Sequence, residues 1–326
     1  MARRLTRREL AALIGAGAVA GPWLARESAG ETAAPQRGRV GVAALAAPAD
    51  GAAVDPAAAR TAIDAVLVAA TGAASGAAAA RLLFKPGDTV GIKVSCIAGA
   101  ILSPRVELVE ALAALVAEAG VPAARVIVFE RSGRELRRAG FTVRKEGGPY
   151  LCYGVDNDYD AEPSTSGQIG SCFARLVSTT CTALVSFGVV KDHDLAGVSA
   201  GMKNWYGVIH NPNKYHDHNC DPYVADVSNH PFLRGKLRLT VLDGVIAQCH
   251  GGPGYRPDAI FPLGLVAAST DPVAADAWAW KVIDAERGRR GMPTLAAANR
   301  APRFLATASG YGLGVGDVAA IKEVRA

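Results

Sequence analysis

The feature that most constrains the fold is a succession of short apolar runs separated by longer amphipathic segments. The clearest example begins with a strong strand signal at residues 88–97. A helix is expected at residues 103–119, where apolar residues recur three and four positions apart, and a buried strand at residues 125–129. Strand, helix and strand in this order predict a βαβ unit, whose two strands pair in parallel with a right-handed crossover.

The same alternation recurs along the rest of the chain. Further strands are expected at residues 40–45, 183–190, 237–242 and 263–268. Helices are expected to start at Asp55-Pro56 and at Asp271-Pro272, because aspartate caps a helix and proline suits its first turn. Residues 75–80 are expected to be a loop rich in Ala and Gly. This alternation predicts a layered α/β fold with a mostly parallel or mixed sheet and helices on both faces.

The first 34 residues have the order of a secretory signal. Arg7 and Arg8 precede a short apolar run at residues 10–20, and small residues follow up to Ala34. The arginine pair indicates the twin-arginine route. The run is shorter than the roughly 20 residues of a membrane-spanning helix, and no other segment is expected to span a membrane. We therefore expect a signal peptide recognised by the twin-arginine export machinery, a periplasmic or otherwise exported protein, and a single α/β domain over residues 35–326.

Charge and cysteine spacing argue against two classes of function. The net charge of +5 is mild and no basic run exceeds a pair, so nucleic-acid binding is not expected. The six cysteines contain no C-x-x-C pair, so an iron–sulfur cluster is not expected. Their even number allows disulfides in an oxidising compartment, although buried cysteines more often serve as small apolar core residues.

All six histidines lie between residues 193 and 250, and four of them fall in a long polar stretch at residues 204–231. Imidazole and thiolate suit zinc, copper or iron, and a catalytic metal site uses about three protein ligands. The candidate ligands for a divalent metal are His193, His210, His216, His218 and Cys220. Three interpretations stay open for this cluster: a metal site, a metal-free site for an anion or substrate, and a solvated polar loop.

Lysines within and after the expected strands indicate an anionic ligand. Lys93 lies inside an apolar strand, where an unpaired ammonium is costly to bury, so we expect it to face a cleft or a carboxylate. Lys191 and His193 follow another strand, at the position where open α/β sheets bind ligands. These three residues are the candidate catalytic groups, with His193 as ligand or general base. The candidate substrate-binding residues are Lys203, Asn204, Lys214, Asp271 and Asp276.

Two sequence patterns have simpler explanations than a functional role. Asp271 is explained equally well as the cap of the helix that follows it. Residues 197–201 match the letters of the G-x-S-x-G nucleophile elbow, which places its serine on a sharp turn directly after a strand. Polar residues separate Ser199 from the apolar run that ends at Val190, so we do not expect Ser199 to be a nucleophile.

Several blocks of residues, in this order along the chain, are similar to a known family. They are Asp88-Thr-Val-Gly-Ile-Lys93, Ser103 to Glu110, Lys191 to Val198, Met202 to Gly207, His210 to His216, Asn219 to Tyr223, and Ser269 to Ala274. From Val40 to the C-terminus the chain resembles the DUF362 family, a domain of unknown function. Many such relatives carry a twin-arginine leader, and some carry an added iron–sulfur domain whose cysteines are absent here. The resemblance implies no catalytic residue.

The preferred hypothesis is an exported enzyme that acts on a small anionic substrate, with metal assistance as one version of it. In this hypothesis Lys93 and Lys191 neutralise the charge of the substrate. A second hypothesis is a non-catalytic periplasmic protein that binds a metal or a small anion through the same residues. A third is an interaction module for a redox partner that carries the missing iron–sulfur domain.

Overall fold

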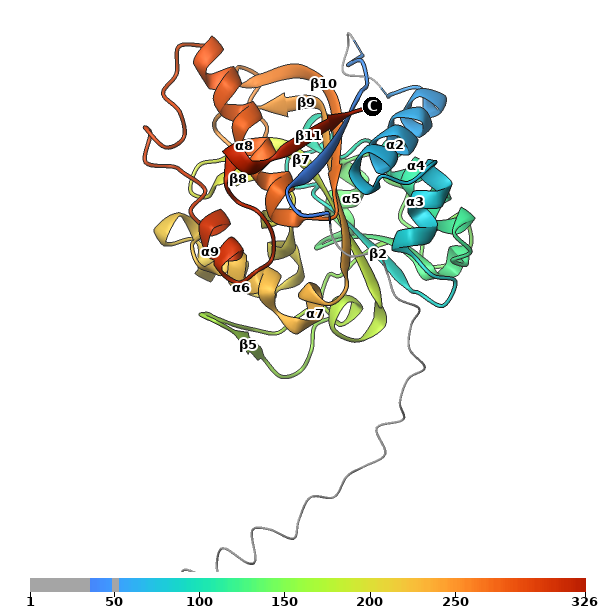
Figure 1. Ribbon diagram of the computed structural model, residues 1–326. Coiled ribbons are helices and arrows are strands. Elements are labelled where there is room, and N and C mark those ends of the chain that lie inside the picture. The colour runs from blue at the N-terminus through green and yellow to red at the C-terminus, as the bar shows by residue number, and fades with distance from the viewer. Residues whose placement is uncertain (1–35, 49–52) are drawn as a thin grey trace, which may run out of the picture. The chain divides into compact units, whose positions relative to one another are not determined.

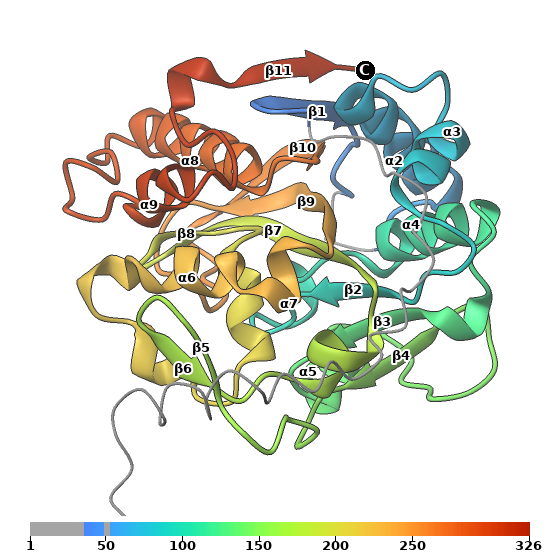
Figure 2. The same ribbon diagram turned by 60° about the horizontal axis from the view of Figure 1, so that its bottom comes forward.

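The computed structural model describes residues 36–48 and 53–326, so the expected signal peptide at residues 1–34 lies outside the described residues. The strands of the main sheet are β1 (Arg39–Ala44), β2 (Val90–Val94), β3 (Val126–Glu130), β4 (Leu151–Gly154), β7 (Ala183–His193), β8 (Gly197–Ser199), β9 (Leu237–Gln248), β10 (Ile260–Ser269) and β11 (Lys322–Arg325). Within the described ranges this sheet has nine strands in the order β11-β1-β10-β9-β7-β2-β3-β4, and β8 pairs with β7 (Figures 1 and 2). Strands β5 (Ser164–Ser166) and β6 (Ile169–Ser171) form a separate small hairpin.

The sheet is mixed, and most of its pairs are parallel. Strands β2, β3, β4, β7 and β9 run in the same direction, as do β1 and β11. Strand β10 is antiparallel to both β9 and β1. The carboxyl ends of β2, β3, β7 and β9 therefore meet at one edge of the sheet, while the carboxyl end of β10 lies at the opposite edge.

Helices cover both faces of the sheet, as the sequence predicts. They are α2 (Pro56–Thr71), α3 (Gly76–Leu83), α4 (Val106–Glu118), α5 (Gly133–Arg138), α6 (Tyr223–Asn229), α7 (Pro231–Arg234), α8 (Pro272–Arg289) and α9 (Phe304–Gly310). Shorter helical turns are η1 (Ala100–Leu102), η2 (Ala123–Arg125), η3 (Leu176–Thr180), η4 (Lys203–Val208), η5 (Pro212–Tyr215), η6 (His218–Cys220) and η7 (Val318–Ala320). Figure 1 shows α2, α3 and α4 on one side of the sheet and α8, α9 and α6 on the other.

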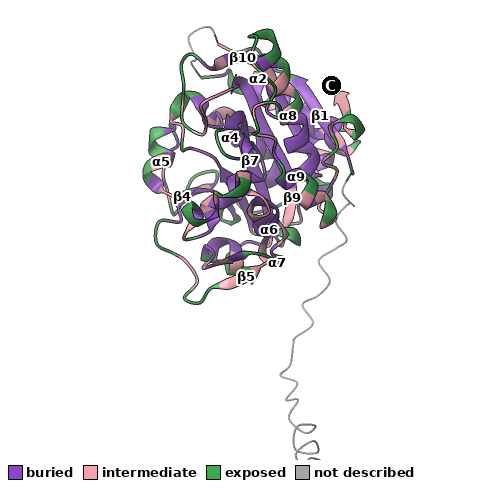
Figure 3. Cartoon of the chain, turned by 90° about the vertical axis from the view of Figure 1, so that its left-hand side faces the viewer, coloured by how far each residue is buried: buried purple, intermediate pink, exposed green. Residues whose placement is uncertain are grey.

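The core consists of apolar side chains on the two faces of the central strands. Every residue of β7 is buried, and the last ten residues of β9 are buried as well (Figure 3). One cluster packs β2, β3 and β7 against α2 and α4, and clusters on the other face pack the sheet against α6 and α8. A strand that is buried on both faces has a continuous apolar sequence, which is the signal that indicated these strands.

Several expected elements are confirmed, and others differ in extent. Asp55 caps α2 and Asp271 caps α8 through side-chain hydrogen bonds, as predicted. Residues 76–83 form α3 rather than a loop, because Ser75 caps the segment and alanine favours helix. Ser103 does not cap α4: its hydroxyl donates to the carbonyl of Gly99 instead.

The expected long loop at residues 204–231 contains short helices, including α6 and several 3₁₀ turns. Among the described residues no single helix is both long and apolar enough to cross a membrane; α2 and α3, bent by 58° relative to each other, meet that test only as a pair. All six cysteines lie in the described part, none is in a disulfide, and five are buried, which fits the expectation of small apolar core residues.

Candidate functional site

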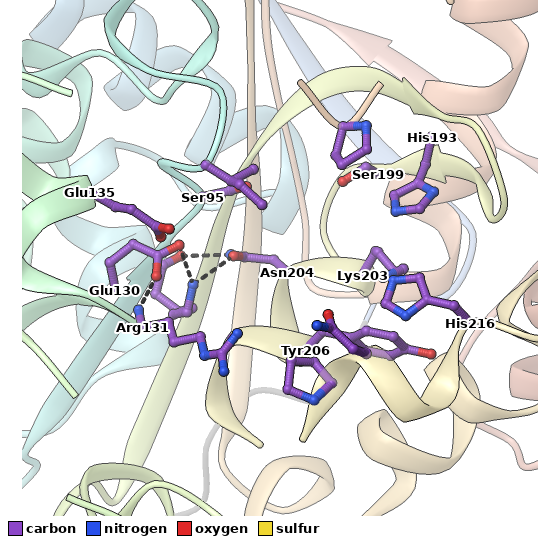
Figure 4. A pocket seen from close by; sticks show the side chains of 16 residues that line it. Ser95, Glu130, Arg131, Glu135, His193, Ser199, Lys203, Asn204, Tyr206 and His216 are labelled. Atoms are coloured by element: carbon purple, nitrogen blue, oxygen red, sulfur yellow. Dashed lines mark hydrogen bonds and ion pairs between the residues drawn. The ribbon is translucent and has the colours of Figure 1, made fainter. Parts of the chain in front are cut away.

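A pocket of about 160 Å³ lies at the edge of the sheet where β2, β3 and β7 end. Its walls combine side chains from these strand ends with side chains from η4 and from the loop that follows it (Figure 4). The sequence-predicted residues that line it are Lys93, His193, Lys203, Asn204 and His216. The pocket therefore has the position at which parallel α/β sheets bind their ligands.

Lys93 is buried at the end of β2, and its ammonium is fully engaged. Nζ donates to Glu130 Oε1 at 3.2 Å, to Asn204 Oδ1 at 3.1 Å and to the carbonyl of Val94 at 2.7 Å. The sequence predicted a cleft or a carboxylate for this lysine, and the structure supplies both. A Cβ at Gly207 would lie 2.7 Å from Lys93 Cε, so the chain passes the lysine closely enough to require glycine there.

A pair of carboxyl groups forms the wall next to Lys93. Glu130 ends β3, and Glu135 belongs to α5, which follows that strand. Burial raises the pKa of Glu135, and the neighbouring Glu130 carboxylate raises it further by repulsion and by a hydrogen bond between the two carboxyl groups. Arg131 lies at the same wall and is exposed. Glu135 can therefore hold a proton at a pH where an ordinary glutamate is ionised.

His193 ends β7 and is held by its own turn. Its Nδ1 accepts from the backbone N–H groups of Leu195 and Ala196 at 3.1 and 3.2 Å. Burial, with further repulsion from Lys203 and His216, lowers the pKa of His193 to about 2. Because Nδ1 accepts, the neutral ring carries its proton on Nε2 and acts as a hydrogen-bond donor.

Lys203 and His216 form the wall opposite the carboxyl pair. Lys203 Nζ lies 3.1 Å from His216 Nε2 and 3.5 Å from the centre of the Tyr206 ring. Burial and the charge of Lys203 lower the pKa of His216, against the opposing effect of backbone hydrogen bonds with Asn213 and Pro212, so a neutral ring can accept a hydrogen bond from the lysine. Burial lowers the pKa of Lys203 to about 8, so a substantial fraction of this amine is neutral near that pH.

Two further polar residues hold η4 in place. Asn204 Nδ2 donates to the carbonyl of Lys93 at 2.8 Å and to Ser186 Oγ at 3.1 Å. Asp276 of α8 accepts from the backbone N–H of Gly201 at 2.7 Å and from that of Met202 at 3.1 Å. Asp276 is buried and does not line the pocket, so it positions the segment that carries Lys203 rather than binding substrate as the sequence predicted.

The end of β7 is tied to a distant part of the chain. Arg300 Nη2 lies 2.6 Å from Asp192 Oδ2, and its Nε donates to the carbonyl of Asp194 at 3.0 Å. Asp192 Oδ1 also accepts from the backbone N–H of Gly252 at 2.9 Å. Burial is the largest effect on Asp192 and raises its pKa, against the opposing effect of Arg300. These bonds fix the strand end on which His193 lies.

Lys191 does not join the pocket that the sequence predicted for it. Its side chain is wholly buried, and in the part of the chain that the structure describes its Nζ has no hydrogen-bond partner. Burial lowers the pKa of Lys191 to about 8, although Cys96 and Glu130 act in the opposite direction. Lys191 is not among the residues that line the pocket.

Four other predicted residues lie outside the pocket. Lys214 and His218 are exposed, and His210 packs edge-on against Tyr159 at the surface. Cys220 is buried, and its Sγ lies 3.9 Å from the carbonyl of His216. These side chains are close in sequence but point in different directions, because residues 218–220 all have positive φ angles and turn the chain sharply.

Asp271 lies at the opposite edge of the sheet because β10 is antiparallel to β9. Its carboxylate accepts backbone hydrogen bonds from Val273 and Ala274 in α8, and also from Gly38 and Val315. The simpler explanation, a helix cap, accounts for this residue. It lines a separate cavity.

Residues 36–48 and 53–326 contain no group of three or more His, Cys, Asp and Glu side chains arranged to hold a metal ion. The hydrogen bonds of His193 and His216 give a physical reason for this finding. His193 Nδ1 is engaged by backbone N–H groups, and His216 Nε2 is engaged by Lys203. The two rings stack at 5.7 Å between centres instead of converging on one point.

The sequence did not point to several residues of the pocket. Glu130 ends β3, and Arg131 and Glu135 follow it. The expectation that ligands bind at strand ends would have found Glu130 and Arg131. Ser95 and Tyr206 also line the pocket. Ser199 does so too, but it lies within β8 and not on a strand-to-helix turn, which agrees with its not being expected as a nucleophile.

The sequence signature of DUF362, a domain of unknown function, matches residues 90–281. The chain belongs to the DUF362 family. The DUF362 match begins with β2 and ends within α8, so it includes Lys93, Glu130, His193 and Lys203. It leaves out β1, β11 and Arg300.

One solved structure with some similarity to this DUF362 protein is a Thermotoga maritima protein that was a target of the Northeast Structural Genomics Consortium. The two share 11% sequence identity with a TM-score of 0.36, over 61% of this chain and 53% of the other. The match thus spans about half the length of that protein. A search of curated proteins found no match.

Proposed function

We propose that this protein is an enzyme that acts on a small anionic molecule by acid–base chemistry in the pocket at the end of β2, β3 and β7. The observation that carries the proposal is the pair of opposite walls. One wall holds Glu135, a carboxyl group with a raised pKa, and the other holds Lys203, an amine with a lowered pKa. Groups whose pKa values are pushed in opposite directions by one site are typical of general acids and bases.

The charge balance of the pocket favours an anion. Lys93 and Arg131 supply two cationic side chains, Lys203 adds a third while it is protonated, and Glu130 offsets one of them through its ion pair with Lys93. Glu135 adds little negative charge when it holds a proton. A cavity of about 150 Å³ can hold benzene, so a pocket of about 160 Å³ suits a molecule of a few heavy atoms.

The roles follow from the contacts. Glu135 would donate a proton to the substrate, and Lys203 in its neutral form would accept one or attack an electrophilic carbon. Arg131, at the exposed wall, would bind the anionic group. His193 would donate a hydrogen bond from Nε2 and would not act as the base or metal ligand first considered for it, because Nδ1 is engaged and the ring resists protonation.

The test is a screen of small carboxylates and phosphates by ligand-observed NMR on the full chain, followed by a time course on each compound that binds. We expect binding of anions and turnover of at least one. Glu135→Gln should abolish that turnover and retain binding, whereas Lys214→Gln, an exposed control, should change neither. Binding without turnover of any bound compound would instead support the non-catalytic binding protein, and failure of every anion to bind would contradict the proposal.

Location outside the cytoplasm is part of the proposal and comes from Arg7 and Arg8 in the sequence alone. It implies that the chain folds before export and meets its substrate in the periplasm or beyond. The pocket itself carries no information on the compartment.

A further inference from the structure

We propose that Lys203 captures its substrate covalently, as an imine with a small carbonyl compound that also carries a carboxylate, such as a 2-oxo acid. The inference rests on the proposed function and names the substrate class of the same pocket. It starts from one contrast. Lys93 and Lys203 both line the pocket, but only Lys203 has a nitrogen that is suited to attack a carbon atom.

The contrast lies in the partners of the two nitrogens. Lys93 Nζ donates three hydrogen bonds, one of them within an ion pair with Glu130, so this nitrogen is held by its partners and is not free to approach a substrate carbon. In the described ranges Lys203 forms no ion pair with a carboxylate; its nitrogen contacts the imidazole of His216 and the face of Tyr206. A desolvated amine without a counter-ion loses its proton readily and becomes a nucleophile.

His216 is placed to move the proton. Its Nε2 lies 3.1 Å from Lys203 Nζ, and burial together with the charge of Lys203 lowers the pKa of this ring, so a neutral His216 can relay a proton from the amine to the substrate oxygen without retaining it. The lowered pKa of Lys203, to about 8, fits an amine that is partly neutral before any substrate arrives. Burial keeps water away from an imine that hydrolysis would reverse: Lys203 is only 7% exposed.

The step balances without a further reactant. The neutral amine attacks the carbonyl carbon, a nitrogen–carbon bond forms, and the carbonyl oxygen becomes a hydroxyl group. The carbon–oxygen bond then breaks as the carbon–nitrogen double bond forms, and the oxygen leaves as water. Both hydrogen atoms of that water come from the amine, passed on through His216, so nothing is oxidised or reduced. The carboxylate of the substrate would face Arg131 on the other wall.

Other candidates in the pocket fit the role less well. Lys191 also has a lowered pKa, but its nitrogen does not line the pocket and cannot reach a substrate there. Ser199 also lines the pocket, but no histidine is free to take its proton. His193 Nδ1 accepts from the backbone, and His216 Nε2 contacts Lys203. The geometry therefore selects Lys203.

The experiment is reductive trapping on the purified full chain. Pyruvate and glyoxylate are added with cyanoborohydride, and intact mass and peptide mapping locate the reduced adduct. We expect one saturable adduct on Lys203, formed faster as the pH rises toward about 8. Peptide mapping of the wild-type chain needs no variant, so a variant that fails to fold cannot obscure the result.

Variants sharpen the assignment. Lys203→Arg keeps the charge and should lose the adduct, whereas Lys214→Arg, the matched change at an exposed lysine of the same region, should keep it. His216→Gln should slow adduct formation by about a hundredfold, the loss typical of a removed proton-transfer group.

Two kinds of failure are distinguishable. If NMR shows that pyruvate or other anions bind but mapping finds no adduct on Lys203, or adducts spread evenly over surface lysines, the imine is overturned and the proposed function stands. If no carboxylate or phosphate binds and no adduct forms, both proposals fall.

Discussion

Lys93 and Asn204 exchange two hydrogen bonds: Lys93 Nζ donates to Asn204 Oδ1 at 3.1 Å, and Asn204 Nδ2 donates to the Lys93 carbonyl at 2.8 Å. The two residues are 111 positions apart in the sequence. The exchange locks the end of β2 to η4, and Asn204 directly follows Lys203. The position of the Lys203 backbone is therefore coupled to Lys93.

The Lys93–Glu130 pair gives the first prediction. Lys93→Met leaves the Glu130 carboxylate buried without its counter-ion, so the variant should lose about 3–5 kcal/mol of unfolding free energy. Lys93→Met combined with Glu130→Gln removes both charges and should recover a large part of that loss. Urea unfolding of the four proteins in this double-mutant cycle measures the difference. Purely additive losses would show that the pair is not coupled.

Gly207 gives the second prediction. A Cβ there would lie 2.7 Å from Cε and 2.8 Å from Nζ of Lys93, and this side chain cannot move aside without breaking its three hydrogen bonds. Gly207→Ala should therefore destabilise the protein by about 1–3 kcal/mol, the usual cost of overpacking. Gly254→Ala, where a Cβ meets no atom within 4 Å, is the matched control. Equal melting temperatures for the two variants would contradict the prediction.

Asp276 gives a prediction on pH. Burial raises its pKa from 3.8 to about 7, so between these values the folded state binds the proton more tightly than the unfolded state. The stability that this carboxyl group contributes is complete below pH 3.8 and is lost as the pH rises through about 7. Asp276→Asn should remove this fall, which is at most a few kcal/mol at about 1.4 kcal/mol per pKa unit. Urea unfolding at several pH values compares it with the exposed control Asp217→Asn.

His193 should remain neutral where ordinary histidines titrate. Its pKa is lowered from 6.5 to about 2, so its ring signals should not shift between about pH 8 and about pH 5. The ring nitrogens, observed by long-range ¹H–¹⁵N NMR, should show the tautomer with the proton on Nε2. His218, which is exposed, serves as the internal comparison. A midpoint near 6.5 for His193 would contradict the lowering of its pKa by burial and by the neighbouring charges.

The export prediction is tested independently of the pocket. Arg7→Lys together with Arg8→Lys keeps the charge of the leader but removes the arginine pair. The variant should accumulate inside the cell, while the unaltered chain should be recovered from the periplasmic fraction. Equal distribution of both proteins between the two fractions would contradict the twin-arginine route.

The fold class could be predicted because strand and helix periodicity are local. The βαβ unit at residues 88–129 and the caps at Asp55 and Asp271 are visible in short windows of sequence. Strand direction is not local. The signal for β10 is an apolar run like any other, and only the pairing of β10 with both β9 and β1 shows that it runs the opposite way. That reversal is why Asp271 is not at the pocket.

The site was predicted in part, for a similar reason. His193 was found because it follows a strand, Lys93 because an ammonium inside an apolar strand needs a cleft or a carboxylate, and Lys203 as one of several lysines able to bind an anion. Closeness in sequence suggested that His216, His218 and Cys220 act together, but the direction of a side chain depends on backbone angles that composition does not encode. Protonation is likewise a property of neighbours: the tautomer of His193 follows from two backbone N–H groups, and its lowered pKa follows from burial and nearby charges, which no motif describes.

The pairing of β10 with β1 bears on how this protein should be subdivided in the laboratory. A fragment limited to the shared family signature, residues 90–281, would keep β10 but lose both β1 and β11. Strand β10 would then expose a long unpaired edge, which is a template for aggregation. It would also lose Arg300 and leave the Asp192 carboxylate buried without its partner. The segment that matches the family, residues 90–281, is therefore shorter than the segment needed to complete the sheet. Expression work should retain residues 36–326.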